Sequence, residues 1–579
     1  MKEFVKMTLA TLAGLFIFGC AAFFLFFGFI GAMASLGEKQ VVMPREAVLK
    51  IDMSTFTLSE QTVEANPMDA LLAGGQKVVP LGIYDAINAI NFAATDPAVK
   101  FIYMKPDGVS GGTAQIEEFR KALKNFRNSG KAVVSYIESP SNAGYYLASV
   151  SDKIYMTEYE GGMSMLNGLS SRMVFLKDLL DELGVNVQLI RHGKYKSAGE
   201  MYIRNSSSPE NMEQNKEMID AVWSSWADEM AQSRGITAEA LNAMLDNLEL
   251  NFPTDYLEKG LVDELVTREQ LQQNLCNLFV VENFKDIKAI QLPEYAKLKN
   301  VPNLKADKKV AVIYAEGNIV DGNGNEDVAG DRFAKVIADV REDDDVKAVV
   351  LRVNSPGGSV LASEKIKAEI KLIQEKGIPV IASYGDYAAS GGYWISAGCD
   401  HIISNATTLT GSIGVFSMIP DISCTLKDKL HVNLTPVNSN KHADMLGMTR
   451  PLTTDEVDYM QASVERIYTK FTELVAEGRE MTVADVDAIA QGRVWAGSDA
   501  LKIGLVDEIG TIEDAIRYAA LSIEGVESLN DVQVAEYPKP QTALEAIMES
   551  LMGGENIFAE LPFERGKVYA RIPYDITIE

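Results

Sequence analysis

Two glycine-rich turns in the second half of the chain carry the residues best suited to chemistry. Asn354–Ser359 reads Asn-Ser-Pro-Gly-Gly-Ser, and Ala388–Trp394 reads Ala-Ala-Ser-Gly-Gly-Tyr-Trp. Both follow apolar runs typical of strands and precede helical patterns, so their glycines can bring backbone N–H groups close to an oxyanion or a phosphate. The Gly357-Gly358 pair is equally compatible with a plain strand-to-helix turn. Ser390, in the second turn, is either a nucleophile or a helix cap.

A serine nucleophile needs a base, and the sequence favours lysine over histidine for that role. His401 follows an aspartate at the start of a predicted strand and His442 lies in a polar stretch, which disfavours a histidine triad. Lysine is the remaining common base, but its ordinary pKa of about 10.4 means that it must be buried to be neutral. Lys194 and Lys196, in the run Arg191–Glu200, are the candidates. Their spacing alone is also that of exposed loop lysines.

The chain repeats itself at an offset of roughly 250 residues, with five matching blocks in the same order. The blocks pair Val99–Met104 with Val346–Leu351, Gly111-Gly112 with Gly357-Gly358, Gly130–Tyr136 with Gly377–Tyr384, Gly144–Ile154 with Gly392–Ile402, and Gly260–Glu264 with Gly504–Glu508. The first copy has Asn142 where the second has Ser390, and Ala443 or Asp444 of the second copy lies opposite Lys196. Duplicated units commonly keep the fold in both copies and the chemistry in one composite site, which favours Ser390 as a nucleophile.

The elements that must position these residues alternate between strands and helices. Predicted strands are Val310–Tyr314, Val349–Val353, Val380–Ser383 and Ile402–Ile403, and predicted helices include Leu361–Lys376 and Asp455–Ala476. Continuous β-branched runs separated by helices predict an α/β fold with mostly parallel, buried strands. Ligands and catalytic groups in such folds lie where strands end and turns open into helices. Between the copies, Gln291–Lys309 with Pro293 and Pro302 predicts a linker.

The N-terminal segment predicts a membrane anchor. Residues 7–36 carry no formal charge and are rich in phenylalanine. As a helix at about 1.5 Å per residue they exceed the roughly 30 Å hydrocarbon thickness of a bilayer. A cleaved signal peptide is the alternative, since Ala32-Met33-Ala34 fits the cleavage pattern, but its apolar region is ordinarily only about 7–15 residues long. The flanking lysines do not decide the orientation of the anchor.

Charge and cysteine content exclude other classes of protein. The net charge of −27 disfavours nucleic acid as a partner. Four cysteines without a CxxC spacing, together with four histidines, disfavour a zinc cluster. We therefore expect neither a metal nor another cofactor.

Together these motifs resemble the long, duplicated bacterial signal peptide peptidases of the protease IV type, within the Clp-protease/crotonase-like superfamily. The resemblance covers nearly the whole chain. It rests on the N-terminal anchor, both repeats, Tyr195–Ala198, Asn354–Gly358, Ala389–Trp394 and Thr410–Val415. The proline that usually follows the Tyr-Lys-Ser-Ala block is replaced here by the run Gly199–Ile203.

The resemblance implies roles for individual residues. Ser390 would be the nucleophile and Lys196 the base, so that each repeat supplies one member of a Ser/Lys dyad. Backbone N–H groups near Gly357, Gly358 and Gly391 would form the oxyanion hole, and Ser412 would help to position the lysine. The resemblance also implies a bowl-shaped homotetramer on the extracytoplasmic side of the bacterial inner membrane, which would settle the orientation. Its substrates would be cleaved signal peptides and other hydrophobic peptides.

We therefore expect an N-terminal transmembrane helix followed by two tandem Clp-protease/crotonase-like α/β repeats. The expected segments are a membrane anchor at 1–40, an N-terminal repeat at 41–295, a C-terminal repeat at 305–535 and a C-terminal tail at 536–579. A crotonase-like acyl-CoA enzyme, in which Gly357 and Gly358 polarise a thioester, is an alternative. An inactive membrane scaffold with an acidic surface is another. The anchor, the pairing of Ser390 with Lys196 and the lack of an obvious basic nucleotide site argue for the peptidase.

Overall fold

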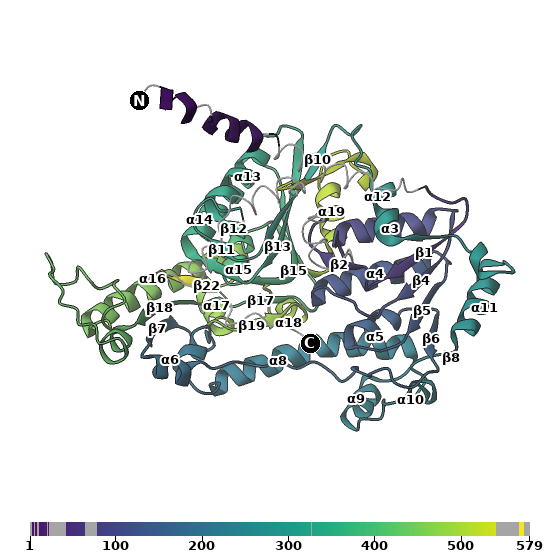
Figure 1. Ribbon diagram of the computed structural model, residues 1–579, viewed down its shortest axis with the longest axis horizontal. Helices are drawn as coiled ribbons and strands as arrows, with labels where there is room; N and C mark the ends of the chain where they lie inside the picture. The colour runs from purple at the N-terminus through teal and green to yellow at the C-terminus, as the bar shows by residue number, and fades with distance from the viewer. Residues whose placement is uncertain are drawn as a thin grey trace.

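The structure is a computed structural model that describes residues 3–4, 6–8, 11–19, 21, 42–63, 78–325, 327–539 and 567–571. Two α/β units lie side by side, the first at the right of Figure 1 and the second in its centre and left. The long helix α8 (Pro209–Arg234) extends from the first unit along the bottom of the second. Segments α6 (Lys177–Leu183) and β7 (Asn186–His192), which belong to the first half of the sequence, therefore lie beside the second unit.

The first unit is built on a six-stranded parallel sheet with the order β8-β6-β5-β4-β1-β9. Its strands are β1 (Ala47–Asp52), β4 (Val99–Lys105), β5 (Val133–Ile137), β6 (Lys153–Thr157), β8 (Glu264–Val266) and β9 (Ala289–Gln291). Helices of this unit are α3 (Ile83–Thr95), α4 (Thr113–Asn128), α5 (Asn142–Ala148), α9 (Ala238–Asp246), α10 (Pro253–Glu258) and α11 (Arg268–Phe279), and β2 (Phe56–Ser59) pairs separately with β3 (Val79–Gly82). Every residue of β5 is buried, as expected for a central parallel strand.

The second unit contains an eight-stranded sheet whose main path is β19-β17-β15-β13-β10-β21, with β16 and β20 attached. Its strands are β10 (Lys309–Glu316), β13 (Val346–Ser355), β15 (Val380–Ala389), β16 (His401–Ser404), β17 (Leu409–Gly411), β19 (Val494–Ala496), β20 (Glu508–Ile509) and β21 (Gln533–Tyr537). The helices are α13 (Gly330–Glu342), α14 (Val360–Glu375), α15 (Gly391–Ser396), α16 (Thr454–Gly478), α17 (Val483–Ile489), α18 (Gly497–Lys502) and α19 (Ile512–Leu521). The predicted strands and helices in this half are confirmed, and so is the α/β class.

A third sheet joins segments that lie far apart in the sequence. Its order is β12-β11-β14-β22-β18-β7. The strands are β11 (Ile319–Val320), β12 (Val328–Ala329), β14 (Gly357–Ser359), β18 (Val415–Asp421) and β22 (Tyr569–Arg571), together with β7. The antiparallel pair of β7 and β18 brings the first half of the sequence onto the second unit. Two independent repeats would not contain such a sheet, and the sequence pattern did not predict it.

The expected linker is shorter than the sequence indicated. Leu292–Lys299 forms helix α12, in which Leu292 and Tyr295 are buried against the first unit. Pro293 lies in the first turn of this helix, where a missing N–H costs no hydrogen bond. The expected limit of the first repeat at residue 295 falls inside α12. The prediction of a linker over Gln291–Lys309 is therefore wrong for its first half.

The predicted membrane anchor at 7–36 lies largely outside the described residues. Within it, residues 11–19 are helical and exposed. No helix among the described residues is long and apolar enough to cross a bilayer.

A buried ion cluster joins the two units. Arg352 on β13 is fully buried, with Nε 2.7 Å from Glu60 Oε2 and Nη1 2.9 Å from Glu118 Oε1. Both carboxylates come from the first unit and are also fully buried. Asn405 and Ser383 complete the cluster, since the Asn405 amide donates to Glu118 at 2.7 Å and Arg352 donates to Ser383 Oγ at 3.0 Å. Such a cluster is tolerated in a core only while every charge keeps its partner.

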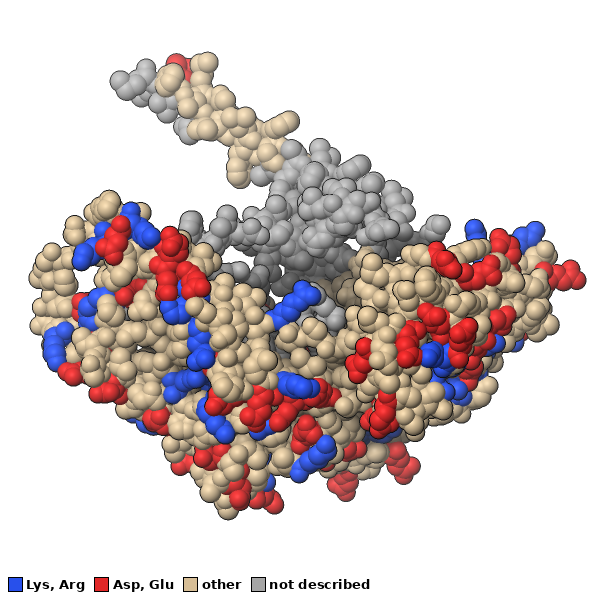
Figure 2. All heavy atoms as spheres, turned by 90° about the horizontal axis from the view of Figure 1, so that it is seen from below, with Lys and Arg blue, Asp and Glu red and all other residues tan. Residues whose placement is uncertain are grey.

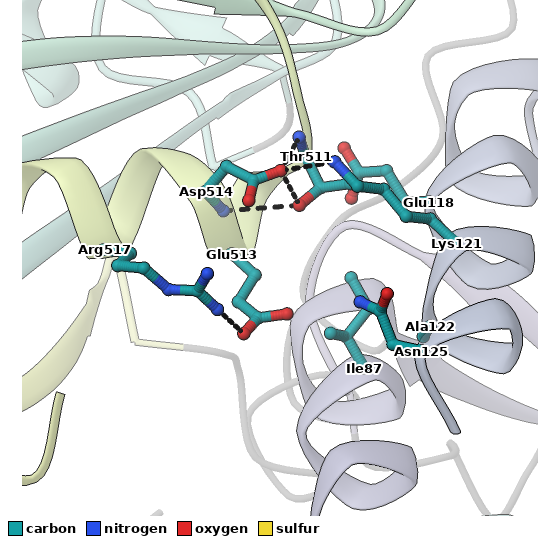
Figure 3. Close-up of a pocket in the computed structure, with 9 residues that line it drawn as sticks. All are labelled: Ile87, Glu118, Lys121, Ala122, Asn125, Thr511, Glu513, Asp514 and Arg517. Atoms are coloured by element: carbon teal, nitrogen blue, oxygen red, sulfur yellow. Dashed lines mark hydrogen bonds and ion pairs between the residues drawn. The ribbon is translucent and has the colours of Figure 1, made fainter. Parts of the chain in front are cut away.

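A second, more exposed contact between the units surrounds a small pocket. Figure 3 shows this pocket between α4 of the first unit and α19 of the second, with Glu118 at its edge. Lys121 Nζ lies 2.7 Å from Asp514 Oδ2 across the same junction. The lining of the pocket includes neither Ser390 nor Lys196.

Replacing the buried arginine should loosen the junction far more than replacing the exposed lysine. Arg352→Met leaves two carboxylates unpaired in the core, and we expect it to lower the free energy of unfolding by about 3–5 kcal/mol. Lys121→Ala removes only a partly exposed ion pair and should cost less than about 1 kcal/mol. Urea unfolding followed by tryptophan fluorescence compares the two variants. Equal losses would contradict the assignment of Arg352 as the residue that joins the units.

Candidate active site

Ser390 lies at the sharp turn between β15 and α15. Its φ of 56° and ψ of −109° are unusual for a residue other than glycine. Hydrogen bonds hold this turn, since Ser390 N donates to Gly411 O at 2.8 Å and Trp394 N donates to Ser390 O at 2.8 Å. The serine is fully buried. A strained residue held by its surroundings is a recurring feature of functional sites.

Lys196 reaches Ser390 from the other half of the sequence. It follows β7, whose pairing with β18 carries the loop onto the second unit. Its Nζ lies 2.8 Å from Ser390 Oγ, 2.9 Å from Ser412 Oγ and 3.1 Å from Ser412 O. The backbone of Lys196 passes so close to Gly492 that a Cβ there would lie 2.6 Å from the Lys196 nitrogen. The structure thus brings together Ser390, Lys196 and Ser412.

The electrostatics of the site suit a lysine base. Lys196 is fully buried, and burial lowers its pKa well below the usual value because a charged amine loses its hydration there. The three oxygen atoms around Nζ belong to hydroxyl groups and a backbone carbonyl, and none of them is charged. A neutral amine 2.8 Å from a hydroxyl can accept its proton.

Two of the predicted glycines lie close together beside the serine. A Cβ built on Gly391 would lie 3.0 Å from the nitrogen of Gly358, so the two glycines approach each other closely. Gly357 N donates to Ser355 Oγ at 3.2 Å, so that its N–H already has a partner. Gly357 has a φ of 96°, a backbone conformation that favours glycine. Of the three predicted glycines, Gly358 and Gly391 are therefore the closely spaced pair, and Gly357 is the one whose N–H is taken up by Ser355.

A buried polar network beneath Lys196 was not found from the sequence. Arg191 donates to Lys196 O at 2.7 Å and lies 3.3 Å from Glu200, which is buried. Glu200 in turn accepts from the hydroxyl of Ser208, the cap of α8, at 2.8 Å. This network occupies the run where the usual proline is missing. Arg191 and Glu200 are close together in the sequence, but a local sequence pattern does not show that Glu200 is buried.

The remaining candidates lie elsewhere. His401 and His442 lie near Glu508 and Glu456, respectively. Asn142, the counterpart of Ser390, accepts from Asn167 N and Gly168 N and donates to Gly168 O, so it holds a loop in place. Lys194 is exposed. The two copies thus share the turn and differ in what its first residue contacts.

Two α/β units, with a buried serine and lysine in contact within the second, have the features of a serine hydrolase. A sequence model of Peptidase family S49 matches residues 125–282 and 373–524, one match in each half. The chain belongs to this family, with the S49 domain present twice, and is a serine protease. This assignment favours the peptidase over the acyl-CoA enzyme and the inactive scaffold.

Three proteins that are similar to most of this chain are named as proteases. Protease 4 of Haemophilus influenzae is 35% identical over 508 residues, covering 84% of this chain and 81% of the relative. Protease 4 of Salmonella typhi is 36% identical, covering 85% and 79% of the two chains. The chloroplastic serine protease SPPA of Arabidopsis thaliana is 32% identical, covering 79% and 68%.

Activity and stability should both rise with pH because of Lys196. With Lys196 as the base, kcat/KM should increase as the pH rises through the lowered pKa of its amine. Since burial lowers the folded-state pKa, the unfolded chain binds more protons between that pKa and about 10.4, and the free energy of unfolding rises with pH in that window. Lys196→Met should remove this contribution.

Peptide hydrolysis and urea midpoints at pH 6 and 9 test both statements. The midpoint of the wild type should gain more over this range than that of Lys196→Met. A pH-independent kcat/KM would contradict the role of Lys196 as the base.

Proposed function

We propose that this protein is an endopeptidase that uses Ser390 as nucleophile and Lys196 as base. The observation that carries the proposal is the 2.8 Å separation of Lys196 Nζ and Ser390 Oγ inside a fully buried site. The membership of the chain in a serine peptidase family supports it.

The geometry supports the following sequence of steps. Neutral Lys196 accepts the proton of Ser390 as Oγ attacks a peptide carbonyl. The N–H groups of Gly358 and Gly391 stabilise the oxyanion, an effect of order 10²–10³ in rate for one such donor. Protonated Lys196 then gives its proton to the leaving amine. Water releases the acyl group from Ser390 by the same route.

Ser412 would position the amine of Lys196. It has a φ of 47°, and its N donates to Arg493 O at 2.7 Å, so its backbone is held rigidly. Its hydroxyl and carbonyl both face Nζ. These two contacts leave the lone pair of the neutral amine directed at Ser390.

The substrates would be extended hydrophobic peptides, such as cleaved signal peptides. Strands β14 and β18 flank the short strand β22 in the third sheet, and an extended peptide in the place of β22 would pair with both. Ala198, Phe416 and Met418 form part of a buried apolar cluster next to β18. An apolar side chain beside the cut would lose water in contact with this cluster.

We further propose that residues 7–36 anchor the chain in the bacterial inner membrane, with the catalytic part on the extracytoplasmic side as a homotetramer. The segments would be the anchor at 1–40, repeats at 41–295 and 305–535, and a tail at 536–579. The uncharged N-terminal run supports the anchor. Figure 2 shows acidic side chains spread over both lobes and interspersed with basic ones, as expected for a water-exposed face of this highly acidic chain.

Replacing either member of the dyad should abolish activity. Ser390→Ala and Lys196→Ala should each lower kcat/KM for a fluorogenic peptide by at least about 10³-fold, because the two act as a unit. Ser390→Ala should also lose fluorophosphonate labelling. Lys194→Ala is the matched control, since this lysine is exposed and two residues away. Full activity of Lys196→Ala, with circular dichroism unchanged, would overturn the dyad.

Removal of the N-terminal segment should release the protein from membranes. The full chain should remain in the pellet after carbonate extraction of bacterial membranes, and a chain lacking residues 1–40 should move to the supernatant. Recovery of the full chain in the supernatant would contradict the anchor and leave the peptidase proposal untouched.

A further inference from the structure

Residues 491–493, just before β19, lie between Ser412 and the loop after β7, here called the lysine loop. On one side, Tyr195 N of the lysine loop donates to Gln491 O at 2.9 Å. On the other side, Ser412 N donates to Arg493 O at 2.7 Å. The segment therefore connects the loop that supplies the amine to the residue whose oxygen atoms face that amine.

The backbone of this segment is strained and closely packed. Gln491 has a φ of 56° and Gly492 a φ of 81°, so two successive residues adopt a left-handed conformation, which only the glycine takes at little steric cost. A Cβ built on Gly414 would lie 2.7 Å from Gly492 Cα and 3.2 Å from Lys196 Cδ. A strained segment keeps such a conformation only where the surrounding contacts hold it in place.

The side chain of Arg493 supplies contacts of this kind. Its guanidinium carbon lies 4.9 Å from the centroid of the Tyr195 ring and 4.3 Å from the centroid of the Trp495 ring. Tyr195 directly precedes Lys196, whereas Trp495 lies on β19. The guanidinium group therefore joins the lysine loop, from the first half of the sequence, to the sheet of the second unit. A planar guanidinium stacks on aromatic rings, which the ammonium of a lysine does not do.

Acidic side chains of α8 hold the guanidinium group against these rings. Arg493 Nη2 pairs with Glu217, and Nη1 lies 3.8 Å from Glu213 Oε1. The Tyr195 hydroxyl donates to the same Glu213 oxygen at 3.0 Å. In Figure 1, β19 lies next to α8, which carries both acids. The Arg493 side chain is only 16% exposed, so the cluster is largely shielded from water.

Lys196 depends on its surroundings for exclusion of water. Its Nζ contacts the hydroxyl groups of Ser390 and Ser412 and the carbonyl of Ser412. Arg191 donates to the Lys196 carbonyl, and Glu200 pairs with Arg191. Burial is the cause of the lowered pKa of the amine. Water that reaches the amine would raise this pKa toward its ordinary value of about 10.4.

We propose that Arg493 is a positioning residue for the peptidase reaction: its contacts with Tyr195 and Trp495 hold the lysine loop in place, so that Lys196 stays beside Ser390. This inference rests on the proposed function of Ser390 and Lys196. The effect of Arg493 reaches the dyad through Tyr195 on one side and through its own carbonyl, bonded to Ser412, on the other. Loss of the guanidinium group loosens the loop and admits water to the amine.

The pH dependence of kcat/KM for a fluorogenic peptide tests the inference. Arg493→Met removes both the charge and the stacking group. We expect the acidic limb of its profile to move to higher pH by at least about half a unit, which lowers kcat/KM on that limb by at least about threefold. Arg493→Lys keeps the charge without the planar group, and its profile should move in the same direction.

Arg234→Met is the matched control. Arg234 belongs to the first unit, its side chain is 12% exposed, and its Nη2 lies 2.8 Å from Asp263 Oδ1. It thus resembles Arg493 in burial and in its ion pair but has no contact with the lysine loop in the described structure. Urea midpoints of all variants measure the loss of stability, and a variant that is merely less stable should keep the wild-type pH profile.

The outcomes separate this inference from the proposed function. An Arg493→Met profile that coincides with that of the wild type overturns the positioning role and leaves the peptidase intact. An equal shift in Arg234→Met also overturns it, because general loss of stability would then be the cause. A wild-type profile in Arg493→Lys overturns the role of stacking. A wild type that neither hydrolyses peptides nor labels with fluorophosphonate overturns the proposed function itself.

Discussion

The contact between Lys196 Nζ and Ser390 Oγ, 2.8 Å apart in a site without solvent access, is the constraint on which the rest of the structure depends. A lysine in water stays protonated at neutral pH and cannot accept a proton. Burial lowers its pKa but costs solvation, so the surrounding structure has to supply compensating contacts. Ser412 supplies two of them through its hydroxyl and its carbonyl. The lowered pKa of Lys196 therefore depends on an enclosure that stays closed to water.

That enclosure is formed by joining the two halves of the duplicated chain. Strand β7 pairs with β18 and carries the lysine loop across, while α8 continues below the second unit. Arg352 with Glu60 and Glu118 holds the units together deeper in the core. A buried cluster of this kind adds little net stability over apolar packing, but it strongly penalises any arrangement that separates its partners. It thus favours the one relative position of the units in which Lys196 meets Ser390.

The two copies of the duplicated unit share a fold but differ in the residue at the start of the short helix. Both units have a parallel sheet and a short helix that follows a turn. In the first unit Asn142 uses its side chain to hold a loop, and in the second Ser390 has its hydroxyl beside Lys196. Strands β14 and β18 come from the second half of the sequence, whereas Lys196 comes from the first. The site is therefore assembled from both halves of the sequence.

Sequence alone determined the alternation of strands and helices, the duplication and the turn that carries Ser390, because periodicity and glycine placement act over a few neighbouring residues. The contrast between Ser390 and Asn142 was also readable from it. Only the tertiary structure decided that a lysine 194 residues away meets this serine, that Leu292–Lys299 is a helix, and that β22 pairs between β14 and β18. These features depend on pairings between distant strands and on which side chains lose water. Such pairings leave no local period in the chain.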